Sequence, residues 1–420
     1  MGAPAARALG GRVMPAPVSM GHGVLRAPDA LHFGEGARVS IAPAVEKFGR
    51  RLGVIVDAFF LDSPEFLEVL KSLDDRGIEY RTFSDVVPEL PLDSVEIAAA
   101  RFSGLEPDAL LAYGGGSAID LAKLVALRLV TSEPLAEFYG ENRVGRTVLP
   151  LIAVPTTAGT GSEVTSVAVV SDPSHALKVG ISDPVLIPRV AIVDPELTLG
   201  APPSITAYSG IDALAHAIES HTARDMRLDW SKTLPVATGA NRLNSGFALG
   251  AIGALGASLV DAYRDGGDRA ARRNNAYGAT LAGIAFSNAG VHLGHAVQYP
   301  LGALTKTPHG MGTGLLLPYV MRACMPWRVE RLAEVGTALV PAMTGTAEER
   351  AEAAISRVAG ITRAIGLPRS LREMGVAKSQ LDEIVEKSLG IARLIGNAPF
   401  EANTEIVGEI VRNAYVGGAP

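Results

Sequence analysis

The chain has 420 residues, more than one compact core usually holds, so we expect two or three packed units. Its 38 Lys and Arg residues against 44 Asp and Glu residues argue against nucleic acid or an anionic membrane as a partner. A hydrophobic fraction of 48% excludes a mainly disordered chain. Cys324 is the single cysteine, which excludes an intrachain disulfide, and we expect a cytoplasmic protein.

The N-terminal part predicts a mixed α/β fold. Residues 1–23 are mostly Ala, Gly, Pro and Arg, which indicates a flexible extension. Residues 24–200 alternate short β-rich runs with helical patterns, which is typical of βαβ units and a mainly parallel sheet. We expect strands at 53–57, 79–83, 109–113, 149–154 and 190–194, a hairpin at 164–170 and 177–181, and helices at 41–51, 63–76, 92–104 and 117–130.

Residues 201–420 predict a second, all-helical domain. Strand signals stop after Pro202 and Pro203, and Ala-rich segments of helical period follow. We expect helices at 205–222, 247–264, 268–287, 309–321, 327–339, 347–365 and 378–389. The most apolar stretch, 245–260, is too short for a membrane span and indicates a core helix. Residues 224–244 are charged and aperiodic, which predicts a loop or an insertion.

A glycine run follows the expected strand 109–113. Gly114, Gly115 and Gly116 lead to Ser117, a natural N-cap, and to Asp120 within the helix. Absent side chains let a pyrophosphate approach the backbone, and a helix N-terminus offsets its charge. The pattern alone is weak evidence, because an ordinary strand-to-helix turn also favours glycine.

A second polar turn follows strand 149–154 and contains Thr156, Thr157 and Thr160. Two such turns at the ends of neighbouring strands fit a cofactor lying across the carboxyl edge of a sheet, although a solvated loop has the same composition. Asp57 ends strand 53–57, where its carboxylate would accept hydrogen bonds from a ribose diol and repel a 2′-phosphate. This favours NAD(H) over NADP(H).

Asp212 and His216 are four residues apart, which places both on one face of a helix. A surface pair at this spacing is at least as common as a ligand pair. The apolar neighbours indicate a buried helix, however, where an unpaired carboxylate is costly. With the downstream histidines His292, His295 and His309, the chain offers three nitrogens and one oxygen for a divalent first-row ion, and such a set also holds zinc.

At this point the sequence resembles the iron-containing (group III) alcohol dehydrogenases over nearly its whole length. The matching motifs are GGGSAIDLAK at 114–123, PTTAGTGSEVT at 155–165, DPELT at 194–198, GIDALAHAIE at 210–219 and PLGALTKTPHG at 300–310. The resemblance implies a Rossmann-like N-terminal domain, an all-α C-terminal domain of the dehydroquinate synthase-like fold, and a catalytic cleft between them.

The resemblance also implies roles for single residues. Asp212, His216, His295 and His309 are similar to the family's metal ligands, with Fe²⁺ as the expected ion and Zn²⁺ as the alternative. Gly115, Gly116, Ser117 and Asp120 resemble its cofactor loop, and Thr156, Thr157 and Thr160 its second cofactor segment. Lys178 is similar to a lysine that approaches the cofactor.

One departure concerns the proton relay. Where typical members have a histidine before Pro-Leu-Gly, this chain has Tyr299. We expect the proton to come through water, the Tyr299 hydroxyl or His292, although Tyr299 also suits simple packing and His292 suits orienting a ligand. Lys306 is expected to border the cleft, where its cation would recognise an anionic substrate, or else to be solvated. GVHLGH at 290–295 and the segment 224–244 resemble the hydroxyacid-oxoacid transhydrogenase branch, but that branch's insertion before Pro308 is missing.

The leading hypothesis is a metal-dependent, NAD(H)-linked alcohol dehydrogenase or aldehyde reductase. Hydride transfer would act on a small aldehyde or alcohol, anionic ones included, whose oxygen lies on Fe²⁺. The alternatives are a hydroxyacid-oxoacid transhydrogenase and a metal-dependent lyase of dehydroquinate-synthase type. We expect a homodimer or a higher homo-oligomer.

Overall fold

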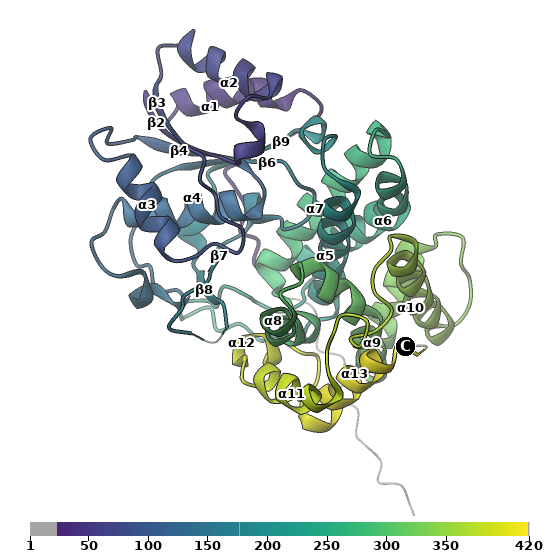
Figure 1. Cartoon of the computed structure of the whole chain (residues 1–420). Helices are drawn as coiled ribbons and strands as arrows, with labels where there is room; N and C mark the ends of the chain where they lie inside the picture. Colours follow the sequence, from purple (N-terminus) through teal and green to yellow (C-terminus); the bar gives the residue numbers. More distant parts are fainter. Residues whose placement is uncertain (1–22, 176, 419) are drawn as a thin grey trace, which may run out of the picture.

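The computed structural model describes residues 23–175, 177–418 and 420. All but the last residue of the expected extension 1–23 therefore lies outside the described residues. Figure 1 shows an α/β part, coloured purple to blue, beside a helical part, coloured green to yellow. This two-part architecture confirms the predicted fold class.

A six-stranded parallel sheet organises the α/β part, in the order β1-β9-β6-β4-β2-β3. The chain runs from β2 outward to β3, and from β4 the opposite way through β6 to β9. The boundary between β2 and β4 is therefore the topological switch point, where α/β sheets usually bind ligands. The strands are β1 (Ala30–Phe33), β2 (Arg51–Val56), β3 (Glu79–Phe83), β4 (Ala109–Gly114), β6 (Leu151–Pro155) and β9 (Val190–Val193).

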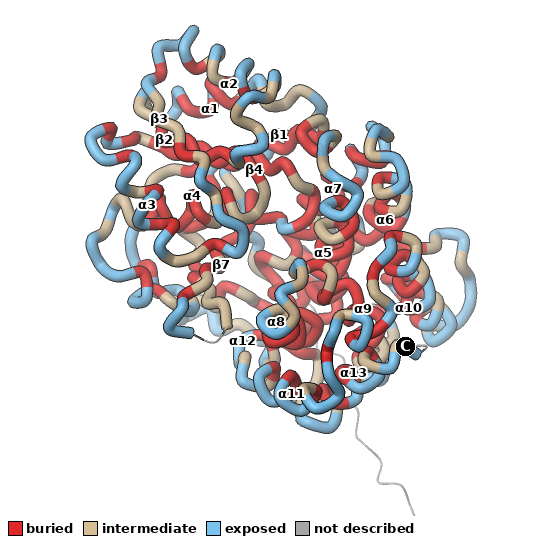
Figure 2. Tube along the Cα trace, viewed as in Figure 1, coloured by how far each residue is buried: buried red, intermediate tan, exposed pale blue. Residues whose placement is uncertain are grey.

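Helices cover both faces of this sheet. Helices α1 (Ile41–Glu46) and α2 (Pro64–Asp74) pack on the face that carries Val54 and Leu111. Helices α3 (Asp93–Arg101) and α4 (Gly116–Arg128) pack on the face that carries Ile55 and Ala112. The inner strands β2, β4, β6 and β9 are buried on both faces, and buried segments of the sheet are red in Figure 2, which explains their continuous apolar runs.

The predicted hairpin is confirmed. It forms from β7 (Val167–Val170) and β8 (Val179–Ser182), which pair antiparallel and join β5 (Gly140–Glu141) in a second, three-stranded sheet. Short 3₁₀ helices lie at Ala37–Ser40, Ala58–Phe60, Leu135–Phe138, Ser162–Val164, Pro184–Leu186, Pro195–Thr198 and Lys378–Gln380.

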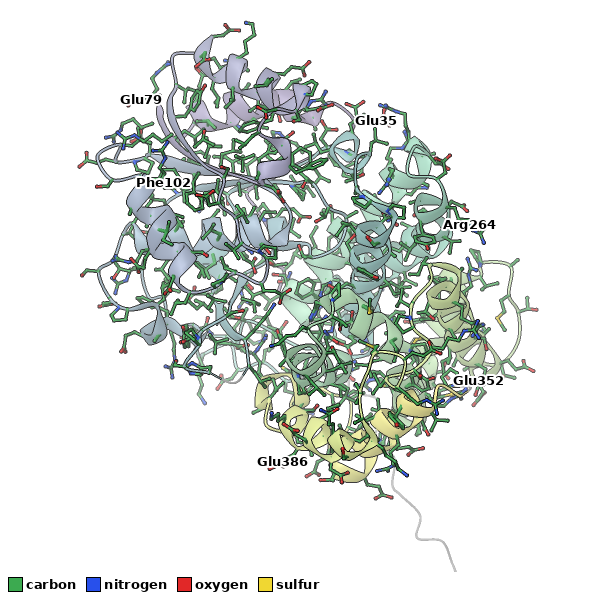
Figure 3. The ribbon with its side chains drawn as sticks, viewed as in Figure 1. Glu35, Glu79, Phe102, Arg264, Glu352 and Glu386 are labelled. Atoms are coloured by element: carbon green, nitrogen blue, oxygen red, sulfur yellow. The ribbon has the colours of Figure 1, made fainter. Side chains whose placement is uncertain are left out.

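The helical part packs around α5, which is buried along most of its length. Its elements are α5 (Pro203–Thr222), α6 (Arg242–Arg264), α7 (Arg269–Ala289), α8 (Leu293–Thr305), α9 (His309–Leu339), α10 (Ala347–Ala364), α11 (Leu381–Leu389), α12 (Ala392–Ile395) and α13 (Thr404–Val416). In Figure 3 the labelled charged residues Glu79, Arg264 and Glu386 lie at the periphery, whereas Phe102 lies within the fold.

Several elements differ from the prediction. The helix expected at 41–51 ends at Glu46, because β2 begins at Arg51. The sequence did not predict β1, α8, α12 or α13. Helix α8 was missed because Pro300 lies inside it and glycines interrupt its period. The two helices expected at 309–321 and 327–339 form one long α9, kinked at Arg328, where the backbone leaves the helical region.

Within the described residues, one helix has the length and mean hydropathy of a membrane span. This is α6, whose most apolar window has a mean hydropathy of 1.5 and is half buried inside the protein. Its buried face packs against α5 and α7 through residues such as Ile252 and Leu255. This packing agrees with the core helix that the sequence predicts.

Candidate active site

Three loops meet at the carboxyl edge of the sheet. They follow β2, β4 and β6, which are neighbours, so Asp57, Gly114 and Thr156 come together. The backbone N–H of Asp57 donates to the Tyr113 carbonyl over 2.9 Å, and that of Thr156 donates to the Gly114 carbonyl over 3.0 Å. The glycine turn and the threonine turn of the sequence are thus parts of one surface.

Gly116 requires the absence of a side chain. A Cβ atom there would lie 2.7 Å from Cγ2 and 2.8 Å from Oγ1 of Thr160, closer than real Cβ contacts. The two turns therefore pack tightly, and the first backbone N–H groups of α4 face the space beside them. This arrangement suits a phosphate group at a helix N-terminus.

Asp120 binds the two turns together. Its carboxylate accepts hydrogen bonds from the Ser162 hydroxyl and, over 3.0 Å, from the Val169 N–H. Burial raises the pKa of Asp120, against the lowering effect of Lys123. Lys123 is itself buried and donates to the Thr165 hydroxyl and the Val167 carbonyl. Asp120 thus holds α4, the second turn and β7 in one arrangement.

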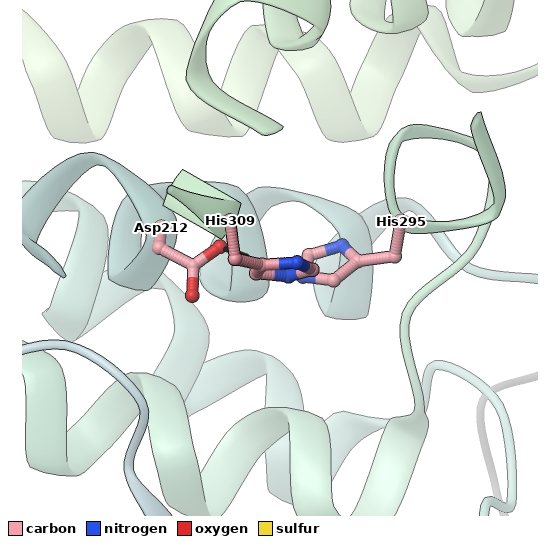
Figure 4. A group of neighbouring side chains, drawn as sticks. All are labelled: Asp212, His295 and His309. Atoms are coloured by element: carbon pink, nitrogen blue, oxygen red, sulfur yellow. Dashed lines mark ion pairs between the residues drawn. The ribbon is translucent and has the colours of Figure 1, made fainter. Parts of the chain in front are cut away.

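A carboxylate and three imidazoles converge in the helical part. Asp212 and His216 lie one turn apart on α5, His295 lies near the start of α8, and His309 begins α9. Figure 4 shows the rings of His295 and His309 meeting beside the carboxylate of Asp212. Ligand atoms of Asp212, His295 and His309 lie within 4.8 Å of one another. Residues more than 90 positions apart in sequence therefore form one cluster.

The distances within this cluster suit a cation between the side chains. The Nε2 atoms of His295 and His309 each lie 3.7 Å from Oδ1 of Asp212, and Nε2 of His216 lies 3.8 Å from Oδ2. These separations are too long for hydrogen bonds. Ligand atoms that share one first-row ion lie about 3 to 4 Å apart, since each bond is about 2 Å long.

The hydrogen bonds around the cluster also fit a metal. Nε2 of His295 is buried without a hydrogen-bond partner, whereas its Nδ1 donates to Glu219 over 2.7 Å. The other ring nitrogen is therefore left to accept a cation, and a carboxylate behind a ligand histidine is the usual supporting arrangement. The Thr313 hydroxyl donates to Oδ1 of Asp212 over 2.8 Å and fixes the carboxylate.

The charge states agree with this arrangement. Burial lowers the pKa of His216 to about 4, and burial also lowers the pKa of His309, so both imidazoles are neutral near pH 7. Burial would raise the pKa of Asp212, but the positive charge that the three imidazoles carry when protonated, together with the Thr313 hydrogen bond, outweighs burial and lowers it. His295 differs from the other two imidazoles: burial lowers its pKa, but Glu219 outweighs burial and raises it. Neutral imidazoles and an ionised carboxylate are the forms that bind metals.

A cavity of about 350 Å³ joins the two halves of the site. The α/β part contributes Gly116, Ser117, Asp120, Thr157, Thr160 and Lys178, and the helical part contributes Asp212, His216, His295, Tyr299 and His309. Gly114, Gly115 and Thr156 support the turns from behind, and Asp57, whose carboxylate accepts the N–H of Phe59, does not line the cavity.

The three residues expected to handle protons or substrate charge have different positions. Tyr299 lines the cavity, with its ring centre 6.1 Å from that of His309, and burial raises its pKa. His292 is fully buried away from the cavity lining and bonds to the Thr222 hydroxyl over 3.0 Å. Lys306 is exposed at the end of α8 and is not among the residues that line the cavity, a position that fits the solvated alternative.

Sequence reasoning missed several residues of the cavity wall. Glu89 and Leu90 reach it through a loop with positive φ angles, and Glu89 forms an ion pair with Lys178. Val236 and Ala237 come from the segment 224–244, which is an ordered loop over the site. Arg393 comes from α12. No local motif marks these residues, because long-range packing brings them to the site.

Comparisons with known proteins agree with the fold and the site. Residues 28–195 match the family described as iron-containing alcohol dehydrogenase, and residues 206–415 match its C-terminal family. The chain is 33% identical to long-chain-alcohol dehydrogenase 1 of Geobacillus thermodenitrificans, covering 93% of this chain and 96% of the relative.

Two solved structures are also similar. A 1,3-propanediol oxidoreductase has a TM-score of 0.87 at 28% identity, covering 94% of this chain and 100% of its own. A sulfoacetaldehyde reductase from Bifidobacterium kashiwanohense, solved in complex with NAD⁺, has a TM-score of 0.81 at 27% identity, covering 94% of this chain and 98% of its own. The protein belongs to the iron-containing alcohol dehydrogenase family, as its motifs predict.

Proposed function

We propose that the protein is an NAD(H)-linked, iron-dependent enzyme that interconverts a small aldehyde and its alcohol. The observation that carries this proposal is the cavity, in which phosphate-binding turns face the Asp212 cluster. The sulfoacetaldehyde reductase that resembles this chain acts on an aldehyde and was solved with NAD⁺, which supports both the cofactor and the direction of reaction.

The residues present fit both groups. Asp212, His216, His295 and His309 would hold the ion, and the turns at Gly116 and Thr157 would hold the dinucleotide. When bound, the reduced nicotinamide supplies a hydride and the divalent ion supplies Lewis-acid polarisation of a carbonyl.

The chain's own residues then prepare the reaction. Glu219 fixes the ring of His295, and Thr313 fixes the carboxylate of Asp212, so the ligand set is organised before substrate enters. Phe286 stacks on His216 with ring centres 4.1 Å apart and gives the pocket an apolar wall that excludes water. Such a pocket orients a small carbonyl compound between the two halves of the site.

Tyr299 is the residue placed to hold a proton. It lines the cavity beside His309, and its raised pKa keeps the hydroxyl protonated near neutral pH, as a donor requires. His292 is sealed behind the ligand set, where its backbone N–H donates to Glu219 over 3.0 Å. We therefore assign the donation of the proton to Tyr299 and a supporting role to His292.

The test is an assay of Fe²⁺-reconstituted protein with NADH or NADPH and a series of short aldehydes. The proposal predicts aldehyde-dependent oxidation of NADH, with NADPH less effective. Exchange between a hydroxy acid and a 2-oxo acid without free NAD would instead identify the transhydrogenase. Substrate turnover without a net change in NADH would identify the lyase.

A homodimer is proposed as the smallest assembly. Strand β1 is an edge of the sheet, and its Leu31 and Phe33 side chains are about 40% exposed. An unpaired edge with apolar side chains favours pairing with another chain. Light scattering of the eluting protein measures the mass directly, and a monomer at micromolar concentration would reject this assignment.

A further inference from the structure

Arg393 is a charged residue of the cavity wall to which the mechanism gives no role. It belongs to α12 and lines the cavity together with Tyr299, His295 and Val291. Its charge acts on the site, because it lowers the pKa of Tyr299 against the larger effect of burial and also opposes protonation of His295. The Arg393 side chain therefore shares one cavity with Tyr299 and His295.

The backbone around Arg393 is fixed against the site. Leu394 is buried in a cluster with Val291 and Ala296, and Tyr299 packs against the same cluster. Two residues beyond α12, the buried side-chain amide of Asn397 donates to the carbonyls of Ala289 and Val291, over 3.0 and 3.1 Å. These contacts hold the backbone of α12 onto the segment between α7 and α8. They place Arg393, whose side chain is exposed to solvent, at the wall of the cavity.

The other charged groups of the cavity wall have partners within the protein. Lys178 pairs with Glu89, Asp120 accepts hydrogen bonds from Ser162 and Val169, and Asp212 accepts one from Thr313. Among the described residues, Arg393 is recorded with neither a hydrogen bond nor an ion pair. A guanidinium left in this way at a cavity is ready to bind an anion, with two N–H groups toward one carboxylate or phosphonate.

We propose that Arg393 is the specificity residue of this enzyme and that its substrate is a short aldehyde or 2-oxo acid with an anionic group. The group is a carboxylate, sulfonate or phosphonate, which pairs with Arg393 while the carbonyl carbon lies between the two halves of the site. This inference rests on the proposed function for the carbonyl chemistry, but the anion site itself is a property of the cavity.

The kinetic test compares two aldehydes of the same chain length, succinic semialdehyde and butanal, on the Fe²⁺-loaded enzyme with NADH. Replacing Arg393 by Gln should lower kcat/KM for succinic semialdehyde by about 10–100-fold, since hydrogen bonds to charged groups are worth that much. The value for butanal should stay within about threefold. Arg393→Lys should recover part of the loss, and Arg412→Gln, on the exposed face of α13, is the matched charge control.

The binding test separates this inference from the proposed function. Ethanesulfonate binding to the holoenzyme is measured by calorimetry for the parent, R393Q and R412Q. If R393Q alone fails to bind ethanesulfonate, the anion site is supported. If neither aldehyde is reduced, only the proposed function is rejected, and the anion site still stands. Three results would overturn the assignment. The first is that R393Q keeps the parent's preference between the two aldehydes. The others are that all three proteins bind ethanesulfonate equally, or that R393Q loses only affinity for NADH.

Discussion

Glu219 supports the set of metal-ligand residues through His295. A variant that removes the charge of Glu219 therefore tests how that set is organised. Its carboxylate is 1% exposed and accepts three hydrogen bonds, from the backbone N–H groups of His292 and Gly294 and from Nδ1 of His295. The substitution Glu219→Gln keeps the shape but offers one acceptor oxygen in place of two. At least one of the three donors then faces an amide N–H.

The magnitude follows from two independent estimates. A buried donor left without a partner costs about 1–3 kcal/mol. Burial would raise the pKa of Glu219, but His292 and His295 outweigh it and lower the pKa from its ordinary value of 4.5 to about 2. A difference of this size stabilises the folded protein by about 3 kcal/mol at pH 7. This stabilisation is present above pH 4.5 and is lost as the pH falls toward 2.

The assay is chemical unfolding of metal-free parent and E219Q proteins at pH 7 and at pH 4, with Fe²⁺ or Zn²⁺ affinity measured by chelator competition. We expect E219Q to be about 3 kcal/mol less stable at pH 7, with a smaller difference at pH 4. Metal affinity should fall by about 10–100-fold. The control is Glu334→Gln, which changes another Glu–His pair, with His221, outside the cavity. Equal stability and equal metal affinity of E219Q and parent would refute the reasoning.

The remaining predictions address single residues of the site. Tyr299→Phe should lower kcat for aldehyde reduction by at least about 10-fold with NADH affinity retained, and unchanged turnover across pH would discard Tyr299 as the proton donor. Gly116→Ala places a Cβ 2.7 Å from Thr160 and should weaken NADH binding by about 10-fold, with metal content unchanged. Fluorescence titration measures the NADH affinity. Equal affinity of the variant and the parent would contradict the close packing of the two turns. Burial raises the pKa of Glu163 to about 7 from its ordinary value of 4.5, so the stabilising effect of the protonated side chain is complete below pH 4.5 and is lost as the pH rises through 7. The unfolding free energy of the parent should therefore fall by up to about 3 kcal/mol between these pH values, and Glu163→Gln should abolish this fall. Parallel pH profiles of unfolding free energy for the two proteins would show that Glu163 does not titrate in this range.

The sequence predicted the sheet and its functional edge well. The inner strands are buried on both faces, so continuous apolar runs such as 109–113 are unambiguous, and glycine or threonine turns mark where β4 and β6 end. Because parallel neighbours end at the same edge, Gly116 and Thr160 were expected near each other, and they are in contact. Asp57 also lies at that edge, although it does not line the cavity.

The ligand cluster was predictable only in part. Asp212 and His216 follow from helical spacing alone, since both lie on α5. Their meeting with His295 depends on α8, which Pro300 and the neighbouring glycines concealed. The resemblance to a known family supplied the grouping that periodicity did not. Glu219 was not predicted, although it lies on the same helix and binds His295.

The sequence pointed to Lys306 as the cation beside the cleft, whereas Arg393 lines the cavity. Lys306 precedes His309 by three residues, so closeness in sequence favoured it, but the end of α8 turns it outward. Arg393 reaches the cavity through the hydrogen bonds of Asn397 to a segment more than 100 residues earlier. Contacts of this kind leave no periodic or local signal in a sequence.

The most direct test of the account is anomalous diffraction at the iron edge from crystals of the Fe²⁺-loaded enzyme. The account predicts one strong peak within bonding distance of Asp212, His216, His295 and His309, facing the turn at Gly116. A peak bound elsewhere, or no peak in crystals of protein that contains stoichiometric iron, would contradict it.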